Sequence, residues 1–333
     1  MLAATATTAA QGGGANDFST LHPDIINSHI LTRLDGPSLA SAACCSATLR
    51  RLSSSDDLWS QICHSTWPST ASPLLSHLIP TFPGGGARAF FSQAYPIISD
   101  VIPSPPSTPP PNLISAVDIR YKDKLIFSKA QETETLTDWF RFSPFRVDML
   151  EPKEVVPTHI THPDGGACKE MTECMTLSWI VINPIRRRAV DLSSHRPVSA
   201  RRHWLTGEVQ VRYASILADE YHGHVMCGIV VTCGESARGG EMQVREVSLE
   251  MEDMDGIHLN GKDSLVFLQG AVVGKKGTGK NSVQESQRRY KEFEEMKRER
   301  RERKLRTEGA LDILCVAFGV SILISFGCFL LCR

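Results

Sequence analysis

The pattern of apolar and polar positions divides the chain into a helical start, a β-rich middle and a helical end. In residues 17–67 apolar side chains recur at helical spacing, and Ile25 and Ile26 belong to a first helix that Pro23 can begin. Gly36 then separates this helix from the next one. The pattern predicts a domain of three or four short helices, whose small core is marginal on its own and favours docking on a partner.

The middle of the chain, residues 113–273, carries runs of apolar residues that are typical of β-strands. Residues 208–213 alternate cleanly between apolar and polar side chains. The apolar positions change parity between Val244 and Val247, which predicts a bulge or two separate strands. The run 265–273 is predicted to be the last strand. Short strands with turn residues between them indicate an antiparallel, sandwich-like domain.

Two stretches near the start are predicted to lack a core of their own. Residues 1–16 have neither a basic segment nor a long apolar run, so we expect a disordered leader rather than an export signal. Residues 68–112 are rich in Pro, Gly and Ser and include an extended Pro-rich run at 103–111. We expect a linker here.

The C-terminal part predicts a charged helix over residues 281–308 that leads into a membrane span over residues 313–332. The span has 20 residues without a charge, which as a helix cover about 30 Å, the hydrocarbon thickness of a bilayer. The preceding stretch 297–306 holds seven basic and two acidic residues. We therefore expect the C-terminus to be a membrane anchor, in an organelle that the sequence does not identify. Because basic flanks stay on the cytoplasmic side, we expect the domains to face the cytosol.

Together these patterns predict an α+β protein: a helical start, an antiparallel β-sandwich-like domain, and a charged helix running into one transmembrane helix. The chain has 333 residues, with 36 Lys plus Arg against 37 Asp plus Glu. A near-neutral chain is not a general polyanion binder, so we expect no nucleic-acid partner. Ten cysteines are too few for a disulfide-stapled scaffold, which favours reduced thiols and a cytosolic environment.

Three stretches have features of a functional site, but an ordinary structural interpretation of each is better supported. Residues 274–280 match a phosphate-binding loop until its last position, where Asn281 replaces the Ser or Thr that holds Mg²⁺. A basic linker is the better interpretation. The basic stretches 186–188 and 201–204 are more typical of solvated loops than of nucleic-acid or lipid contacts.

Two sets of His and Cys have the residue types of a zinc site, but neither contains the Cys-x-x-Cys spacing. The sets are His159, His162, Cys168 and Cys174, and His222, His224, Cys227 and Cys233. Core and loop positions are the better interpretation of both. The spacing of the chain singles out no catalytic group, so we expect no catalytic, metal-binding or cofactor-binding residue and no cofactor.

The helical start resembles an F-box. Leu21 and Pro23, with His22 inserted between them, match the Leu-Pro opening of that motif, and Leu58-Trp59 matches its closing pair. The resemblance to a plant family of F-box proteins continues through Trp67 and the Phe-rich segment at 82–91. It implies a non-catalytic substrate-recognition adaptor of a Skp–cullin–F-box ubiquitin ligase. The partners it implies are a Skp-type adaptor, a cullin and an unknown protein substrate.

The resemblance also implies which side chains contact the Skp-type adaptor. We expect these to be Leu21, Pro23, Ile25, Ile26, Leu39 and Trp59. For a substrate held by the β-rich domain, we expect contacts from Trp139, Trp179 and Trp204. The alternative function is a membrane-anchored carbohydrate- or lipid-binding module without a role in ubiquitination.

Overall fold

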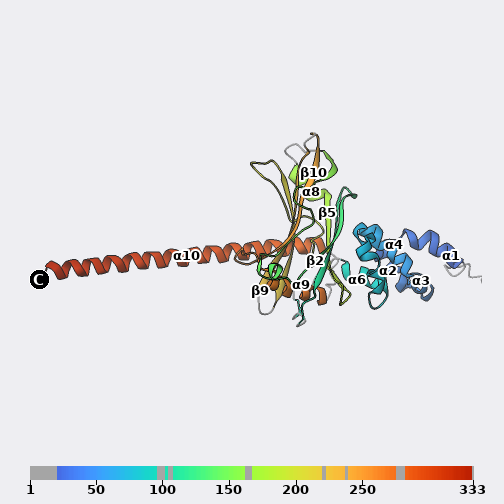
Figure 1. The fold of residues 1–333 in the computed structure, drawn as a ribbon, viewed down its shortest axis with the longest axis horizontal. Coiled ribbons are helices and arrows are strands. Elements are labelled where there is room, and N and C mark those ends of the chain that lie inside the picture. Colours follow the sequence, from blue (N-terminus) through green and yellow to red (C-terminus); the bar gives the residue numbers. More distant parts are fainter. Residues whose placement is uncertain are drawn as a thin grey trace, which may run out of the picture. The chain divides into compact units, whose positions relative to one another are not determined.

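The computed structural model describes residues 21–95, 102–103, 108–161, 167–219, 223–236, 239–274 and 282–331. The expected leader, the centre of the Pro-rich run and residues 275–281 of the loop-like motif lie outside these ranges. The chain divides into two compact units, Met1–Ile62 and Cys63–Arg333, which are described separately (Figure 1).

The first unit consists of short helices, as its apolar spacing predicts. The elements are α1 (Pro23–Ile25), the π-helical turn η2 (Ile26–Ile30), the 3-10 turn η3 (Leu31–Arg33), α2 (Gly36–Cys45), α3 (Ala47–Leu52) and α4 (Asp56–Thr66). Side chains cap both α2 and α3. Asp35 accepts a hydrogen bond from the Ser38 N–H at 2.9 Å, and Ser46 accepts one from the Leu49 N–H at 3.1 Å. Such caps pair N–H groups that otherwise lack helical partners.

The second unit begins with four short helical elements where we predicted a linker. They are η4 (Pro68–Ala71), α5 (Pro73–Ser76), η5 (Ile79–Thr81) and α6 (Gly86–Ala94). The linker prediction is wrong for these residues. Proline is well suited to the first turn of a helix, and the first three elements each carry one there. Leu75, Phe82 and Phe90 are buried, and the rings of Phe82 and Phe90 pack edge to face at 5.3 Å.

A four-stranded antiparallel sheet has the order β2-β1-β5-β6. Its strands are β1 (Asn112–Tyr121), β2 (Lys124–Glu134), β5 (Met175–Asn183) and β6 (Arg188–Asp191). The two-residue turn between β1 and β2 holds Lys122 and Asp123 at φ values of 48° and 62°. Positive φ at both positions is typical of the tight hairpin turns whose twist matches that of the strands.

A six-stranded sheet has the order β3-β10-β9-β8-β7, and β4 also pairs with β10. Its strands are β3 (Arg146–Asp148), β4 (Val156–Thr161), β7 (Ser199–Arg202), β8 (Val209–Asp219), β9 (Gly223–Glu235) and β10 (Glu241–Asp253). The pairing of β10 with β9 shifts register between Val244 and Glu246. The bulge that the change of parity predicts is therefore confirmed.

One apolar core contains side chains from both sheets, including Ile119 and Trp179 from the first and Tyr213 from the second. The helix α9 (Gly261–Val273) also contributes to this core, and it replaces the last strand that we predicted. The strand prediction fails because α9 is buried along most of its length, so its residues show no amphipathic period. Two short helices, α7 (Asp138–Phe142) and α8 (Ala167–Cys174), complete the α+β fold.

The predicted charged helix and the predicted span form one continuous helix, α10 (Ser282–Leu331). Its first part packs on β8, with Phe293 fully buried beside Ala214 and Met226. Its second part extends beyond the sheets (Figure 1). From Lys304 to Leu331 nearly every residue is exposed.

Candidate functional site

The six residues expected to contact a Skp-type adaptor fall into two groups. Leu21 and Ile25 are 40% and 46% exposed, and Pro23 between them is exposed as well. Ile26, Leu39 and Trp59 are buried, with exposed fractions of 2% or less. These three side chains stabilise the interior and offer almost no surface to a partner. The exposed group stays our prediction for the adaptor contact.

The inserted His22 has a local structural role at the start of this group. Its Nδ1 accepts a hydrogen bond from the Asp24 N–H at 3.3 Å and so caps α1, whose first residue is Pro23. Leu21 precedes this cap, Ile25 is the last residue of α1, and both side chains are exposed. The insertion therefore leaves an apolar pair exposed beside Pro23.

The closing pair of the motif, Leu58 and Trp59, is buried inside the protein. The Trp59 Nε1–H donates to the Ser53 carbonyl at 2.6 Å. Leu58 is buried beside it in the sequence, with 4% exposed. The pair therefore holds α4 in place after the turn that follows α3.

The three tryptophans expected to contact a substrate do not come together. Trp179 is fully buried, and its Nε1–H donates to Ser115 Oγ at 3.2 Å. Trp139, on α7, is 83% exposed, and Trp204, in the turn between β7 and β8, is 88% exposed. The strand register places this turn at one end of the six-stranded sheet, whereas α7 lies near the other end, where Pro144 pairs with Asn260. Only Trp139 and Trp204 offer surface to a substrate.

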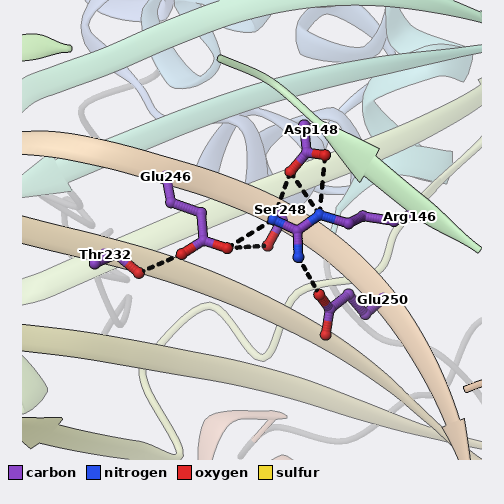
Figure 2. Close-up of polar contacts among 6 residues, drawn as sticks. All are labelled: Arg146, Asp148, Thr232, Glu246, Ser248 and Glu250. Atoms are coloured by element: carbon purple, nitrogen blue, oxygen red, sulfur yellow. Dashed lines mark hydrogen bonds and ion pairs between the residues drawn. The ribbon is translucent and has the colours of Figure 1, made fainter. Parts of the chain in front are cut away.

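An arginine held by three carboxylates lies at the edge of the six-stranded sheet (Figure 2). The Arg146 guanidinium donates to Asp148 at 2.8 and 2.9 Å, to Glu250 at 2.6 Å and to Glu246 at 2.7 Å. The Thr232 hydroxyl also donates to Glu246, at 2.6 Å. Burial opposes ionisation of Glu246, but the hydrogen bonds from Thr232 and Arg146 outweigh it and lower the pKa of this carboxyl.

This cluster borders a groove of about 610 Å³ between β2 and the β3–β10 edge. Arg245 crosses the groove, where it donates to Glu208 at 2.6 Å and to the Glu235 carbonyl at 2.7 Å. Gly234 leaves room for this guanidinium, since a Cβ there would lie 2.6 Å from Arg245 Nε. No short motif in the sequence predicts this site. Its one sequence signal is the even spacing of Glu246 and Glu250, which puts both carboxylates on one face of β10.

The helix α10 is long and apolar enough to cross a membrane, and its apolar window is not buried against the rest of the chain. Three of the basic residues before this window pair with the sheet instead of remaining free for lipid. Lys297 pairs with Glu252, and Arg300 and Lys304 both pair with Asp255, at 2.8 and 2.9 Å. Much of the basic stretch therefore attaches α10 to the β-rich unit.

Within the described ranges, no group of three or more His, Cys, Asp or Glu side chains is placed to hold a metal ion. Two residues of the sets considered above, His162 and His222, lie outside those ranges. Cys227 and Cys233 are fully buried in the core, and burial raises the pKa of each thiol to about 12. Both are therefore neutral core residues near pH 7.

The structure thus combines exposed apolar residues at the start of a helical unit with a separate β-rich unit. The chain belongs to the plant F-box protein family. It is 48% identical over 307 residues to the "Probable F-box protein At2g36090" of Arabidopsis thaliana, covering 91% of this chain and 90% of the relative.

Two further relatives from Arabidopsis thaliana support this assignment over nearly the whole chain. The "F-box protein At2g27310" is 42% identical, covering 96% of this chain and 97% of the relative. The "F-box protein At3g44326" is 41% identical, covering 88% and 84%. No protein-family model and no solved structure matches the chain.

F-box proteins are non-catalytic subunits of E3 ubiquitin ligases, so the family explains why no nucleophile or acid–base pair is required in this chain. Membership also implies a Skp-type adaptor and a cullin as partners. The resemblance found in the sequence of residues 17–63 is thus confirmed at the level of the family.

Proposed function

We propose that the chain is the substrate adaptor of a Skp–cullin–F-box ubiquitin ligase and that residues 313–332 tether it to a membrane, with both folded units in the cytosol. The observation that carries the adaptor role is the exposed apolar group Leu21, Pro23 and Ile25 in a chain of this family. Burial of such side chains on a partner gains about 25 cal/mol per Å² of apolar surface, and a few of them dominate the affinity of an interface.

Co-purification with a Skp-type adaptor tests this contact. We expect the double variant Leu21→Ala, Ile25→Ala to lower recovery about tenfold or more, since central apolar contacts cost above about 1 kcal/mol each when truncated. Arg51→Ala changes an exposed residue of the same unit and is expected to leave recovery unchanged. Equal recovery of the double variant, with unchanged helical circular dichroism, would show that the adaptor docks elsewhere.

In the proposed complex, the β-rich unit holds the protein substrate near the ubiquitin-charged enzyme. The gain in rate comes from the raised effective concentration of substrate lysines and not from a group on this chain. The exposed indoles of Trp139 and Trp204 are the proposed contacts, because large aromatic side chains with little conformational freedom are favoured at interfaces. The variants Trp139→Ala and Trp204→Ala are expected to reduce capture of ubiquitinated proteins without affecting adaptor recovery.

The membrane tether is supported by the exposure of the apolar part of α10, where Ile313 and Leu323 are 73% and 71% exposed. So much exposed apolar surface on one helix is unfavourable in water. Extraction of membranes at alkaline pH tests the tether, and the full chain is expected to stay in the pellet. Leu323→Arg places a charge at mid-span, which costs about 2.5–3.5 kcal/mol, and is expected to release protein into the supernatant. Thr307→Arg, before the span, is the matched control.

A further inference from the structure

A second concave site lies on the opposite sheet from the Arg146 groove. It is a pocket of about 400 Å³, within the usual size range of small-molecule sites, and all of its lining residues belong to the second unit. It forms where the last turn of α4 and the residue after α6 meet β1 and β5. The side chains that matter for its chemistry are those of Trp67, Tyr95, Leu177, Arg120 and Arg196.

The two arginines of this pocket bond to backbone carbonyls and not to carboxylates. Arg120 donates to the carbonyl oxygens of Ser65 at 2.8 Å and of Asp123 at 3.4 Å. Arg196 donates to the carbonyl oxygen of Glu173 at 2.6 Å. Neither guanidinium forms an ion pair within the ranges that the structure describes. A guanidinium carries five N–H donors, so both retain charge and donor capacity toward the pocket.

The acidic residues of the pocket do not cancel this charge by direct pairing. Asp118 is only 3% exposed and accepts hydrogen bonds from the Ser69 N–H at 2.9 Å, from Ser69 Oγ at 2.5 Å and from Ser128 Oγ at 2.7 Å. Burial raises the pKa of this carboxyl. Asp123 lies in the β1–β2 turn and offers Arg120 its backbone carbonyl.

One side of the pocket is apolar and aromatic. Trp67 is 2% exposed and is held by a hydrogen bond from its Nε1–H to Ser178 Oγ at 3.2 Å. Tyr95 is 41% exposed, and its ring stacks on Phe91 with 5.4 Å between centroids. Leu177 completes this side. The wall is therefore fixed by packing before any ligand binds, which lowers the entropic cost of binding.

We propose that this pocket binds a small organic anion, a carboxylate or phosphate monoester attached to a flat apolar body. The anionic group pairs with the guanidinium groups of Arg120 and Arg196, and the apolar body lies against the ring of Tyr95. Guanidinium groups suit carboxylates and phosphates because they present parallel N–H donors to two oxygens. The site depends neither on the adaptor contact nor on the membrane tether.

Calorimetric titration of the detergent-solubilised full chain tests the proposal with three probes: phenyl phosphate, phenylacetate and the neutral benzyl alcohol. At least one anion is expected to bind, and benzyl alcohol is not. Arg196→Gln is expected to weaken anion binding about tenfold or more, and Arg196→Lys, which keeps the charge, less so. Arg186→Gln, an exposed arginine outside the pocket, is the control and is expected to bind like the unmodified chain.

Three outcomes would overturn the proposal. They are the absence of anion binding up to about 10 mM, equal binding of benzyl alcohol, and undiminished binding by Arg196→Gln. Thermal melting without ligand separates loss of the site from loss of the fold, since Arg196→Gln removes only a surface bond to the Glu173 carbonyl. If Arg196→Gln melts at a lower temperature, anion binding by Arg196→Lys is compared with that by Arg186→Gln. Weaker binding by Arg196→Lys supports the proposal, and equal binding overturns it.

Discussion

The attachment of α10 to the β-rich unit depends mainly on one buried ring. Phe293 is fully buried against Ala214 and Met226, on the outer side of the sheet and apart from the main core. We therefore predict that Phe293→Ala detaches the first part of α10 from the sheet and leaves the core of the unit folded. The same substitution leaves the apolar window of α10 unchanged.

The magnitude follows from comparing the ring with the ion pairs. Truncation of a buried Phe to Ala costs about 3–5 kcal/mol. Arg300 and Lys304, whose side chains are 54% and 58% exposed, pair with Asp255 in contact with solvent, and such pairs contribute about 0–1 kcal/mol each. Lys297 is more buried, and burial lowers its pKa, so the cost of removing its charge from water offsets much of its pairing with Glu252.

Hydrogen exchange of the backbone amides in residues 283–304 measures this attachment. A loss of about 3–5 kcal/mol corresponds to an increase of about two to three and a half orders of magnitude in the opening equilibrium. Met296→Ala truncates an apolar side chain of the same helix that is 38% exposed, and it serves as the control. If removal of the three paired basic residues accelerates exchange more than Phe293→Ala does, the ion pairs and not the ring attach α10 to the sheet.

Three further predictions concern the stability of the second unit. Asp123→Gly relieves a positive φ of 62° in the β1–β2 turn, a conformation that costs a residue with a Cβ about 1–2 kcal/mol. The greater freedom of glycine in the unfolded chain offsets about 0.4–1 kcal/mol of this, so thermal melting is expected to show a net gain of about 1 kcal/mol or less. Gly261→Ala directs a Cβ at the Phe140 carbonyl, so a loss of about 1–3 kcal/mol is expected in chemical denaturation. Glu246, whose pKa is lowered, contributes stability that is present above its ordinary pKa of 4.5 and is lost as the pH falls below it, so Glu246→Gln should make the melting temperature less dependent on pH below about 4.5.

A specific result would contradict each of these three predictions. For the turn, a lower melting temperature of Asp123→Gly would show that relief of backbone strain is outweighed by the greater freedom of glycine in the unfolded chain. Gly309→Ala is the control for the steric argument, because nothing lies within 4 Å of its added Cβ, and an equal loss there would remove the role of Phe140. For Glu246, the melting temperatures of the unmodified chain and of Glu246→Gln are compared as a function of pH. Parallel curves would mean that this carboxyl does not lose its charge in this range.

Local patterns in the sequence were sufficient for much of the β-rich unit. The alternation in residues 208–213 and the change of parity after Val244 reflect contacts along neighbouring strands, and both are confirmed. The prediction for residues 265–273 fails because a helix buried on most sides has the same composition as a buried strand. Its N-cap, Asn260, accepts a hydrogen bond from the Asp263 N–H at 2.8 Å, which was the available sequence signal for a helix.

The candidate sites were harder to predict because they depend on exposure. Trp139, Trp179 and Trp204 are equivalent in composition, yet their exposed fractions are 83%, 0% and 88%. An exposed fraction depends on which elements pack over the side chain, and the neighbouring residues in the sequence do not show this packing. Two of the three carboxylates around Arg146, those of Glu250 and Glu246, come from residues 104 and 100 positions away, so no short motif reveals the cluster.

Because α10 is one continuous helix, it sets the distance between the β-rich unit and a bilayer. Lys304, the last residue paired with the sheet, precedes Ile313 by nine positions, which corresponds to about 13 Å of helix. A stiff spacer of this length, unlike a flexible tether, restricts the unit to a narrow layer next to the lipid. With the proposed span in place, the accessible clients are proteins of the same membrane and proteins that come into this layer.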